Sequence, residues 1–247
     1  MNPTGAVLWE GRSPLDGAYI VAIVTGLRRP SENPKTGPMA QTWTLCRDQH
    51  PTRAALHNAD RAICGDCPLR GDRLRGRGCY VSLLSAPAAV WRAYRRGYYP
   101  RLSPDQVGNA IGRRGLRIGS YGDPAVVPFD VWRQVARRCV PAVGYTHLWR
   151  TCDPEFKNLV MASCQTEADY FEAVAAGWRT FRVRLAEQPL LAGEKACPNE
   201  TKALTCDRCG GCGGANSRRP NFAIVAHGGH FAKPAVEKLL LHLAATQ

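Results

Sequence analysis

The stretch LRIGSYGDPAVVPFDVWRQVARRCVPAVGYTHLWR, residues 116 to 150, holds one helix-like segment with a strand-like segment before it and another after it. LRIGSYG and GYTHLW are short and rich in apolar, β-branched and aromatic residues, whereas VPFDVWRQVARRC repeats its apolar residues at helical spacing. A strand, a helix and a second strand in this order form a unit whose two strands run parallel in one sheet. The stretch therefore predicts an α/β protein with a mainly parallel sheet.

The same alternation continues on both sides of this stretch. It predicts helices over residues 86 to 97, 166 to 177 and 234 to 245, and strands over residues 158 to 163, 179 to 184 and 221 to 227. Strands over residues 19 to 25 and 42 to 45, joined by the proline- and glycine-rich residues 26 to 40, predict a hairpin-like start. We expect residues 1 to 85 to hold these strands and the first cysteine group, and residues 86 to 247 to hold the alternating core and the second group, within one continuous domain.

Polar residues follow the predicted strands of the second half of the chain. The carboxyl ends of parallel strands meet at one edge of a sheet, where the loops that follow them open a cleft. We therefore expect a catalytic site there, in which Asp123 and His147 act as acid, base or nucleophile. Ser120 and Arg182 complete the candidate catalytic set. The alternative for each residue alone is a helix cap, a turn or a surface charge.

Four cysteines between residues 197 and 212 form the clearest motif of the chain. Cys206, Cys209 and Cys212 are spaced C-x2-C-x2-C in a glycine-rich loop, and Cys197 precedes them. Four thiolates suit a tetrahedral zinc ion or a [4Fe–4S] cluster, so the number of ligands does not choose between them. The close spacing of the triplet favours the cluster. We expect this metal centre to support folding.

A second set of cysteines lies in ICGDCPLRGDRLRGRGCYV, residues 63 to 81. Cys64, Cys67 and Cys79 can hold a [4Fe–4S] cluster whose fourth iron stays open. They can also hold a zinc ion whose fourth ligand is His57 or a distant residue. The first arrangement offers a place for chemistry, and a closed structural zinc site is the alternative.

The number of cysteines is eleven, and the chain shows no pattern typical of export. No charged segment followed by an apolar one opens the sequence, and no apolar run approaches about 18 residues. We therefore expect a soluble cytoplasmic protein without membrane contact, whose thiols stay reduced. The cysteines without partner spacing, which we expect to be small buried apolar residues, are Cys46, Cys139, Cys152 and Cys164.

Positive charge is concentrated in one segment. The chain has 247 residues and a formal net charge of +13, and residues 61 to 117 alone contain twelve arginines and three aspartates, a net charge of +9. Guanidinium groups match phosphate oxygens and neutralise a polyanion, so we expect a nucleic acid or another phosphorylated ligand to bind here. The candidate contacts are Arg73, Arg75, Arg77, Arg95 and Arg96. An arginine-rich surface that is only solvated is the alternative.

A series of short segments between about residues 33 and 230 follows an order that a known family shares. These segments are NPKTGPMAQTW, CGDCPLRG followed by GCY, RIGSYGDP, GYTHLW, LVMAS, WRTFRVR, CP, CDRCGGC and AIVAHG. Their order resembles that of phage and prophage proteins grouped with the mycobacteriophage gene-product-88-like proteins. The resemblance implies a phage-associated, cluster-binding protein of the host cytoplasm, with an incomplete TIM-like barrel similar to that of radical S-adenosylmethionine enzymes. Those enzymes hold their open cluster with C-x3-C-x2-C, from which the spacing of Cys64, Cys67 and Cys79 departs.

Two classes of function follow from these patterns. The first is a metal- or iron–sulfur-cluster-dependent enzyme that modifies a base of a nucleic acid, with the arginines on the phosphates and the base in the strand-end cleft. A base transglycosylase in which Asp123 attacks the sugar is a further form of this class. The second is a non-catalytic, zinc-stabilised module that binds nucleic acid. The convergence of polar groups at the strand ends favours the enzyme, because a binding module does not need a cleft.

Overall fold

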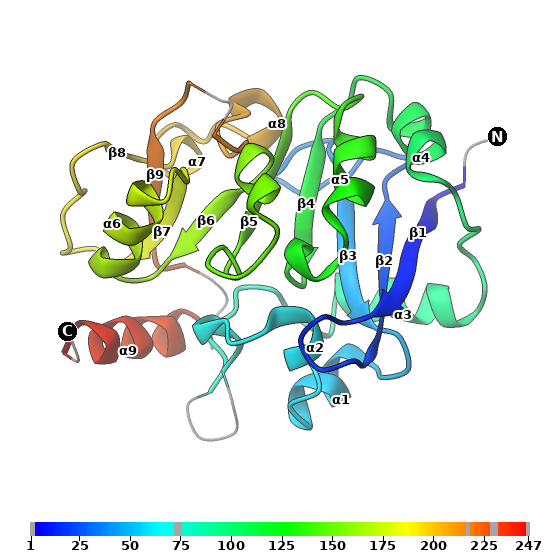
Figure 1. The fold of residues 1–247 in the computed structure, drawn as a ribbon, viewed down its shortest axis with the longest axis horizontal. Coiled ribbons are helices and arrows are strands. Elements are labelled where there is room, and N and C mark those ends of the chain that lie inside the picture. Colours follow the sequence, from blue (N-terminus) through cyan, green and yellow to red (C-terminus); the bar gives the residue numbers. More distant parts are fainter. Residues whose placement is uncertain (1–2, 72–75, 216–217, 228–231, 246–247) are drawn as a thin grey trace.

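The computed structural model describes residues 3 to 71, 76 to 215, 218 to 227 and 232 to 245, and these residues contain one sheet of nine strands (Figure 1). The strands are β1 (Gly5–Arg12), β2 (Tyr19–Thr25), β3 (Ala40–Cys46), β4 (Leu116–Tyr121), β5 (Ala142–Thr146), β6 (Met161–Cys164), β7 (Thr180–Arg184), β8 (Glu194–Ala196) and β9 (Asn221–Val225). Their order in the sheet is β1-β2-β3-β4-β5-β6-β7-β9-β8.

The sheet is mainly parallel. The pairs β1 with β2 and β2 with β3 are antiparallel, and every later pair is parallel. These pairings confirm the α/β fold and the hairpin-like start. Within the described residues the sheet stays open, with β1 and β8 at its edges, so it does not form a closed TIM-like barrel. The sheet also runs across residue 85, because β3 pairs with β4.

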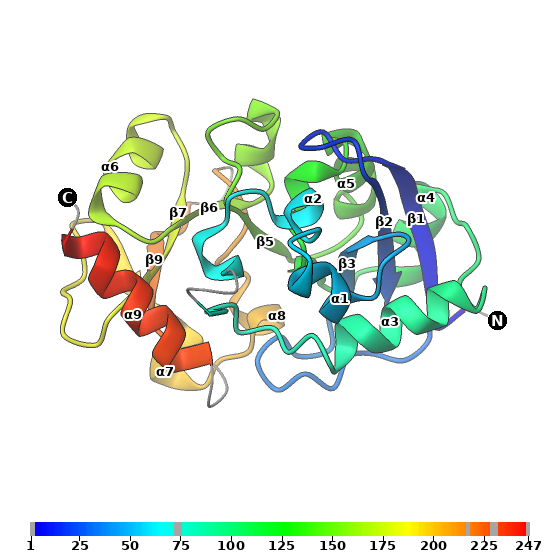
Figure 2. The same cartoon turned by 90° about the horizontal axis from the view of Figure 1, so that it is seen from below.

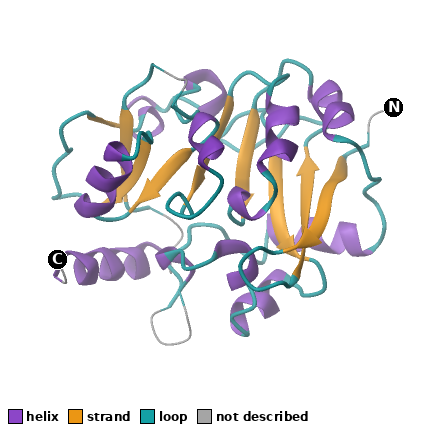
Figure 3. Cartoon of the chain, viewed as in Figure 1, coloured by secondary structure: helices purple, strands orange, loops and turns teal. Residues whose placement is uncertain are grey.

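Helices cover both faces of the sheet and one of its ends (Figure 3). Among the described residues they are α1 (Pro51–Leu56), α2 (Arg61–Cys64), α3 (Ala86–Arg95), α4 (Pro104–Ile111), α5 (Phe129–Ala136), α6 (Glu167–Ala175), α7 (Pro198–Lys202), α8 (Cys206–Cys209), α9 (Ala232–Ala245) and the 3-10 helices η1 (Pro68–Arg70), η2 (Pro124–Val126) and η3 (Pro154–Asn158). Figure 2 shows α4, α5 and α6 on one side of the sheet, and α3, α7 and α8 on the other. No helix of the described residues has the length and apolarity needed to cross a bilayer.

The order and direction of the strands determine where the polar residues at their carboxyl ends meet. From β3 to β7 the strands follow one another in sequence and in space, and right-handed crossovers keep the connecting helices α5 and α6 on the same face. All these strands therefore end at one edge of the sheet. The segment with α1 and α2, and the C-terminal helix α9, lie below that edge in Figure 1.

Alternation along the strands provides a separate apolar cluster on the face opposite α5 and α6. Val143 of β5, Met161 of β6 and Phe181 of β7 pack there with Phe222 of β9. Cys212, from the loop of the second cysteine group, belongs to the same cluster. The loop therefore packs on the face of the sheet that would form the interior of a closed barrel.

Several of the described elements lack a clear signal in the sequence, among them β1, β8 and α4. Strand β1 has a register shift between Val7 and Trp9 that interrupts its alternation, and β8 has three residues. Helix α4 contains Gly108, a residue that weakens helices. A Cβ atom at Gly108 would lie 3.1 Å from the side chain of Arg138, which follows α5 in the chain. This close packing favours glycine at position 108.

Candidate functional site

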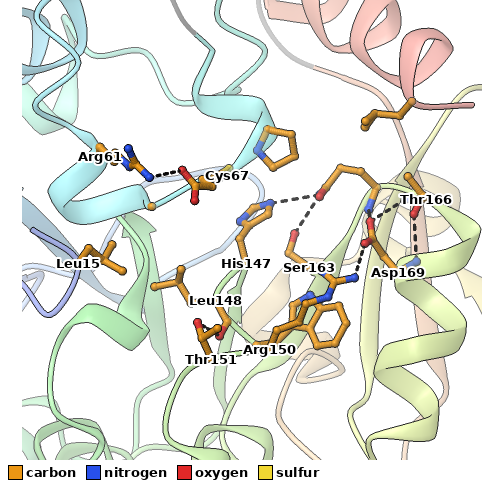
Figure 4. A pocket seen from close by; sticks show the side chains of 16 residues that line it. Leu15, Arg61, Cys67, His147, Leu148, Arg150, Thr151, Ser163, Thr166 and Asp169 are labelled. Carbon is orange, nitrogen blue, oxygen red and sulfur yellow. Dashed lines mark hydrogen bonds and ion pairs between the residues drawn. The ribbon is translucent and has the colours of Figure 1, made fainter. Parts of the chain in front are cut away.

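A cavity of about 450 Å³ opens at the carboxyl ends of β5 and β6 (Figure 4). Besides Leu15 and Leu243, three parts of the chain form its walls. They are the first cysteine segment with Asp66 and Cys67, the loop after β5 from residue 147 to 151, and the turn between β6 and α6 with Ser163 and Gln165. The cavity therefore lies at the edge of the sheet where the sequence predicts a cleft.

His147 belongs to a hydrogen-bonded group inside this cavity. Its Nε2 atom lies 3.1 Å from Nε2 of Gln165, which also lies 3.4 Å from Oγ of Ser163. With the amide of Gln165 as donor, Nε2 of His147 is the acceptor in the tautomer that carries its proton on Nδ1. Burial lowers the pKa of His147, although Asp123 acts in the opposite direction. The neutral imidazole is suited to proton transfer.

Asp123 holds the loop that carries His147. Its Oδ1 accepts hydrogen bonds from Oγ1 of Thr146 at 2.7 Å and from the backbone N–H of Ala125 at 2.9 Å. Its Oδ2 accepts from the backbone N–H of His147 at 2.7 Å. Burial raises the pKa of Asp123, while His147 and these hydrogen bonds lower it. With both oxygens engaged in this way, Asp123 positions His147 rather than facing the cavity.

The other two candidate catalytic residues have partners elsewhere. The hydroxyl of Ser120 donates to Oε1 of Gln41 at 2.5 Å. Arg182 forms a bidentate ion pair with Glu194, at 2.7 and 2.8 Å, and both side chains are buried. Of the four candidates, all within the described residues, His147 alone lines the cavity.

The three cysteines of the first group gather beside the cavity. Cys67 lines it, and burial raises the pKa of Cys67 to about 12. Burial also raises the pKa of Cys64, and the charges of Cys67, Asp60 and Cys79 raise it further. His57 is exposed at the end of α1. As the side chains of the described residues stand, no three of His, Cys, Asp or Glu are arranged to hold a metal ion.

Asp60 braces the segment that carries these cysteines. Its buried carboxylate pairs with Arg70 at 2.9 Å and with Arg77 at 3.0 Å. One candidate for nucleic-acid contact, Arg77, is therefore engaged inside the protein. Arg95 is exposed and pairs with Asp48 at 3.2 Å.

The remaining arginine candidates divide between exposed and undescribed positions. Arg96 is exposed at the end of α3. Arg73 and Arg75 lie outside the described residues. The segment that holds them begins and ends at neighbouring points, because a Cβ atom at Gly71 would lie 1.8 Å from the carbonyl oxygen of Gly76.

The four cysteines of the second group share one small cavity of about 20 Å³. Cys206 and Cys209 lie at the two ends of α8, and Gly210 follows with a φ of +58°, a left-handed conformation that glycine adopts readily. The hydroxyl of Tyr145 donates to Sγ of Cys212 at 3.3 Å. The structure thus brings together the four thiols that the spacing of the motif groups.

The isolated cysteines behave as small apolar residues. Cys46, Cys139 and Cys164 are buried, and Cys152 is partly buried. Burial raises the pKa of each of these thiols. These positions agree with the prediction that they fill space in the core.

Two acidic residues that pair with candidate arginines carry no signal in the sequence. Asp60 is one acid beside an arginine-rich segment, and Glu194 lies in the short strand β8. What identifies them is their burial beside arginines, which the sequence does not display. Comparisons of the chain with models of protein families, with curated proteins and with solved structures gave no match, so the resemblance to the gene-product-88-like proteins stays a prediction.

Proposed function

We propose that this protein is a metal- or iron–sulfur-cluster-dependent enzyme that modifies a base of a nucleic acid in the cavity of His147. One observation carries the proposal. Cys67, a member of the three-cysteine group, lines the same cavity as His147, Ser163 and Gln165. A group able to hold a reactive metal thus adjoins a group able to transfer a proton.

The chemical character of the cavity suits a nucleobase. Its volume of about 450 Å³ lies in the range of small-molecule sites. Its charged groups are paired with each other, Arg61 with Asp66 at 3.1 Å and Arg150 with Asp169 at 2.7 Å. The hydrogen-bonding groups left to bind a ligand are uncharged. A flat polar base fits such a site better than a phosphate, which would stay outside with the exposed arginines.

The residues of the chain have distinct roles in this proposal. His147 accepts or donates a proton at the base, Gln165 orients its imidazole ring, and Asp123 holds its loop. Cys64, Cys67 and Cys79 would hold the metal or cluster. The three thiols are partly buried, and burial raises the pKa of each, while the guanidinium of Arg77 acts in the opposite direction and favours the thiolate that a metal needs. When bound, the group would supply an open coordination position or an electron.

Two alternatives have less support from the geometry. A base transglycosylase would use Asp123 as a nucleophile, but both oxygens of Asp123 accept hydrogen bonds from the loop that it holds. A non-catalytic nucleic-acid-binding module would use Arg77 as a contact, but Asp60 already pairs with it.

The test is a search for modified nucleosides. Protein purified without oxygen is incubated with DNA or RNA, a reductant and S-adenosylmethionine, and the nucleosides are analysed by mass spectrometry. We expect wild type to shift the mass of one nucleoside and His147→Ala to lose this activity. His57→Ala should keep it, because His57 is exposed at the end of α1. Unchanged nucleosides with metal-loaded wild type, together with binding of nucleic acid at low salt, would favour the non-catalytic module instead.

A further inference from the structure

Two buried arginines border the second cysteine group. Arg117 is 5% exposed, and its guanidinium lies 4.4 Å from the ring centre of Tyr145 and 3.4 Å from the hydroxyl of Tyr80. Arg179 is 8% exposed and donates to the backbone carbonyls of Gly211, Gly213 and Pro220. Among the described residues, neither arginine forms an ion pair with a carboxylate.

Such uncompensated cations are costly inside a protein. A buried charge without a counter-charge lowers stability by several kcal/mol. Another buried arginine of this chain does have a counter-charge, because Arg182 pairs with Glu194. The nearest ionisable groups to Arg117 are phenols and thiols. Burial lowers the pKa of Arg117, but these groups, Cys206 and Cys212 among them, raise it by more.

We propose that Cys197, Cys206, Cys209 and Cys212 bind one divalent metal ion of the zinc type as four thiolates, and that Arg117 and Arg179 balance the charge of this centre. Each thiol loses its proton to solvent as its sulfur binds the ion. Four thiolates and one divalent ion leave two negative charges. The two guanidinium groups supply two positive charges, so the buried region becomes neutral.

The size of the shared cavity is compatible with a single ion. Its volume of about 20 Å³ is little more than that of one water-sized sphere. A tetrahedral zinc ion needs no more room than this between four sulfur atoms, whereas a [4Fe–4S] cluster brings four irons and four sulfides. The cavity as it stands therefore fits a single ion better than a cluster, although the spacing of the triplet in the sequence favours a cluster.

The backbone around the thiols supports a compact turn. A Cβ atom at Gly211 would lie 3.1 Å from Sγ of Cys209 and 2.6 Å from the ring of Phe222, so the absence of a side chain lets the loop close on the sheet. The four thiols do not form a ligand set as they stand. Binding requires the sulfur atoms to turn toward the cavity that they already line.

Metal at this position would fasten two distant parts of the chain. The backbone N–H of Cys206 donates to the carbonyl of Lys35 at 2.9 Å, and the N–H of Gly144 donates to the carbonyl of Cys212 at 3.1 Å. The proposed ion thus joins the connection before β3 to strand β5 through the cysteine loop. Its role is structural and does not depend on the function proposed for the cavity of His147.

The first test measures metal in the full chain. Zinc and iron are quantified in wild type, Cys209→Ser and Cys139→Ser, where Cys139 is a buried cysteine outside both groups. We expect Cys209→Ser to lose one zinc per chain with its iron unchanged, and Cys139→Ser to match wild type. Loss of iron and sulfide instead of zinc from Cys209→Ser would overturn the proposal, as would unchanged zinc.

The second test addresses the arginine and does not require a cysteine variant to fold. Zinc affinity is measured by competition with a chromophoric chelator in Arg117→Gln and Arg117→Lys. We expect Arg117→Gln to weaken binding about tenfold or more, as removal of a supporting group around a metal does, and Arg117→Lys to recover most of the affinity. Equal affinities in wild type and Arg117→Gln would contradict the charge balance.

A third measurement uses wild type alone. Alkylation of its cysteines is mapped by mass spectrometry before and after addition of zinc to protein treated with a chelator. We expect zinc to protect Cys197, Cys206, Cys209 and Cys212 together. Alkylation of these four residues at the same rate with and without zinc would show that they do not share an ion.

Discussion

The two cysteine groups differ in what surrounds them more than in what they contain. The group of Cys64, Cys67 and Cys79 lies at the edge of the sheet, next to a cavity of about 450 Å³. The group of Cys197, Cys206, Cys209 and Cys212 lies on a face of the sheet, around a cavity of about 20 Å³. Open space beside thiols leaves room for a substrate, whereas a closed space leaves room only for a ligand that the thiols share. The same residue type therefore points to chemistry in one region and to stability in the other.

Charge separates the two regions in the same way. In the first region the buried carboxylate of Asp60 pairs with both Arg70 and Arg77. In the second region Arg117 and Arg179 lack a carboxylate among the described residues, and the thiols are the groups able to supply negative charge. The comparison suggests a criterion beyond the number of cysteines, namely whether the buried arginines beside the thiols have a carboxylate partner.

The largest effect on stability is expected at Asp60. Asp60→Asn leaves Arg70 and Arg77 without a counter-charge, and the loss of one partner of a buried ion pair costs about 3 to 5 kcal/mol. The free energy of unfolding is measured in urea. Asp48→Asn is the matched control, because exposed Asp48 also pairs with two arginines, Arg47 and Arg95, and exposed pairs contribute less than about 1 kcal/mol. An equal loss of unfolding free energy in both variants would show that burial does not strengthen the ion pairs of Asp60 relative to those of Asp48.

The next effect distinguishes the two cysteine groups directly. Cys212→Ser should lower the free energy of unfolding by about 3 kcal/mol when free zinc is 100 times the dissociation constant, because the folded state loses its ion. Cys67→Ser should cost less and should abolish the nucleoside modification. Thermal unfolding with and without added zinc measures the first effect. Equal destabilisation by the two variants, with equal response to zinc, would contradict the proposal that the group of Cys212 has a structural role and the group of Cys67 a chemical one.

A smaller effect is expected at Asp123. Asp123→Asn places an amide where the carboxylate accepts hydrogen bonds from Ala125, Thr146 and His147, and an unsatisfied buried donor costs about 1 to 3 kcal/mol. Chemical denaturation measures the loss, and zinc content should not change. Thr166→Ala, at the start of α6, is a control for the loss of a helix cap alone, at about 1 kcal/mol. Stability equal to wild type in Asp123→Asn would contradict the role of Asp123 in holding the loop of His147.

The smallest effect is a dependence on pH. The pKa of His147 is lowered from 6.5 by burial, so the unfolded chain binds a proton there more readily than the folded chain. Stability from this residue is present above pH 6.5 and falls as pH decreases below 6.5, by at most about 1.4 kcal/mol per pH unit. His147→Gln should reduce this slope, whereas His57→Gln should keep it. Measurements above about pH 5 avoid the titration of carboxylates with ordinary pKa values. Identical slopes in all three proteins would show that His147 is not buried as a neutral ring.

Local patterns in the sequence predicted much of the fold. The periodicity of residues 127 to 139 and 166 to 177 indicates α5 and α6, and the alternation of strands and helices indicates a parallel sheet. These features depend on neighbours within a few residues, which the sequence displays directly. Strands β1 and β8 escaped prediction because pairing with β2 and β9, rather than their own composition, stabilises them.

The residues of the two sites also divide into those that the sequence predicted and those that it did not. The spacing of Cys206, Cys209 and Cys212 already groups these thiols, because residues three apart in a short turn cannot lie far from one another. His147 was predicted from its place at the end of a strand. The partners of Asp123 and Arg182 were not, since a carboxylate that holds a loop and one that attacks a substrate look alike in a sequence.

Spacing and periodicity along the chain are enough to determine an α/β protein, its parallel core and two cysteine groups. The tertiary structure decided that the sheet stays open, that Arg182 pairs with Glu194, and that Arg117 is buried beside thiols instead of exposed to a polyanion. The reason is physical. Local structure follows from interactions between near neighbours, whereas burial and charge compensation join residues that are far apart in the chain and become defined when the sheet assembles.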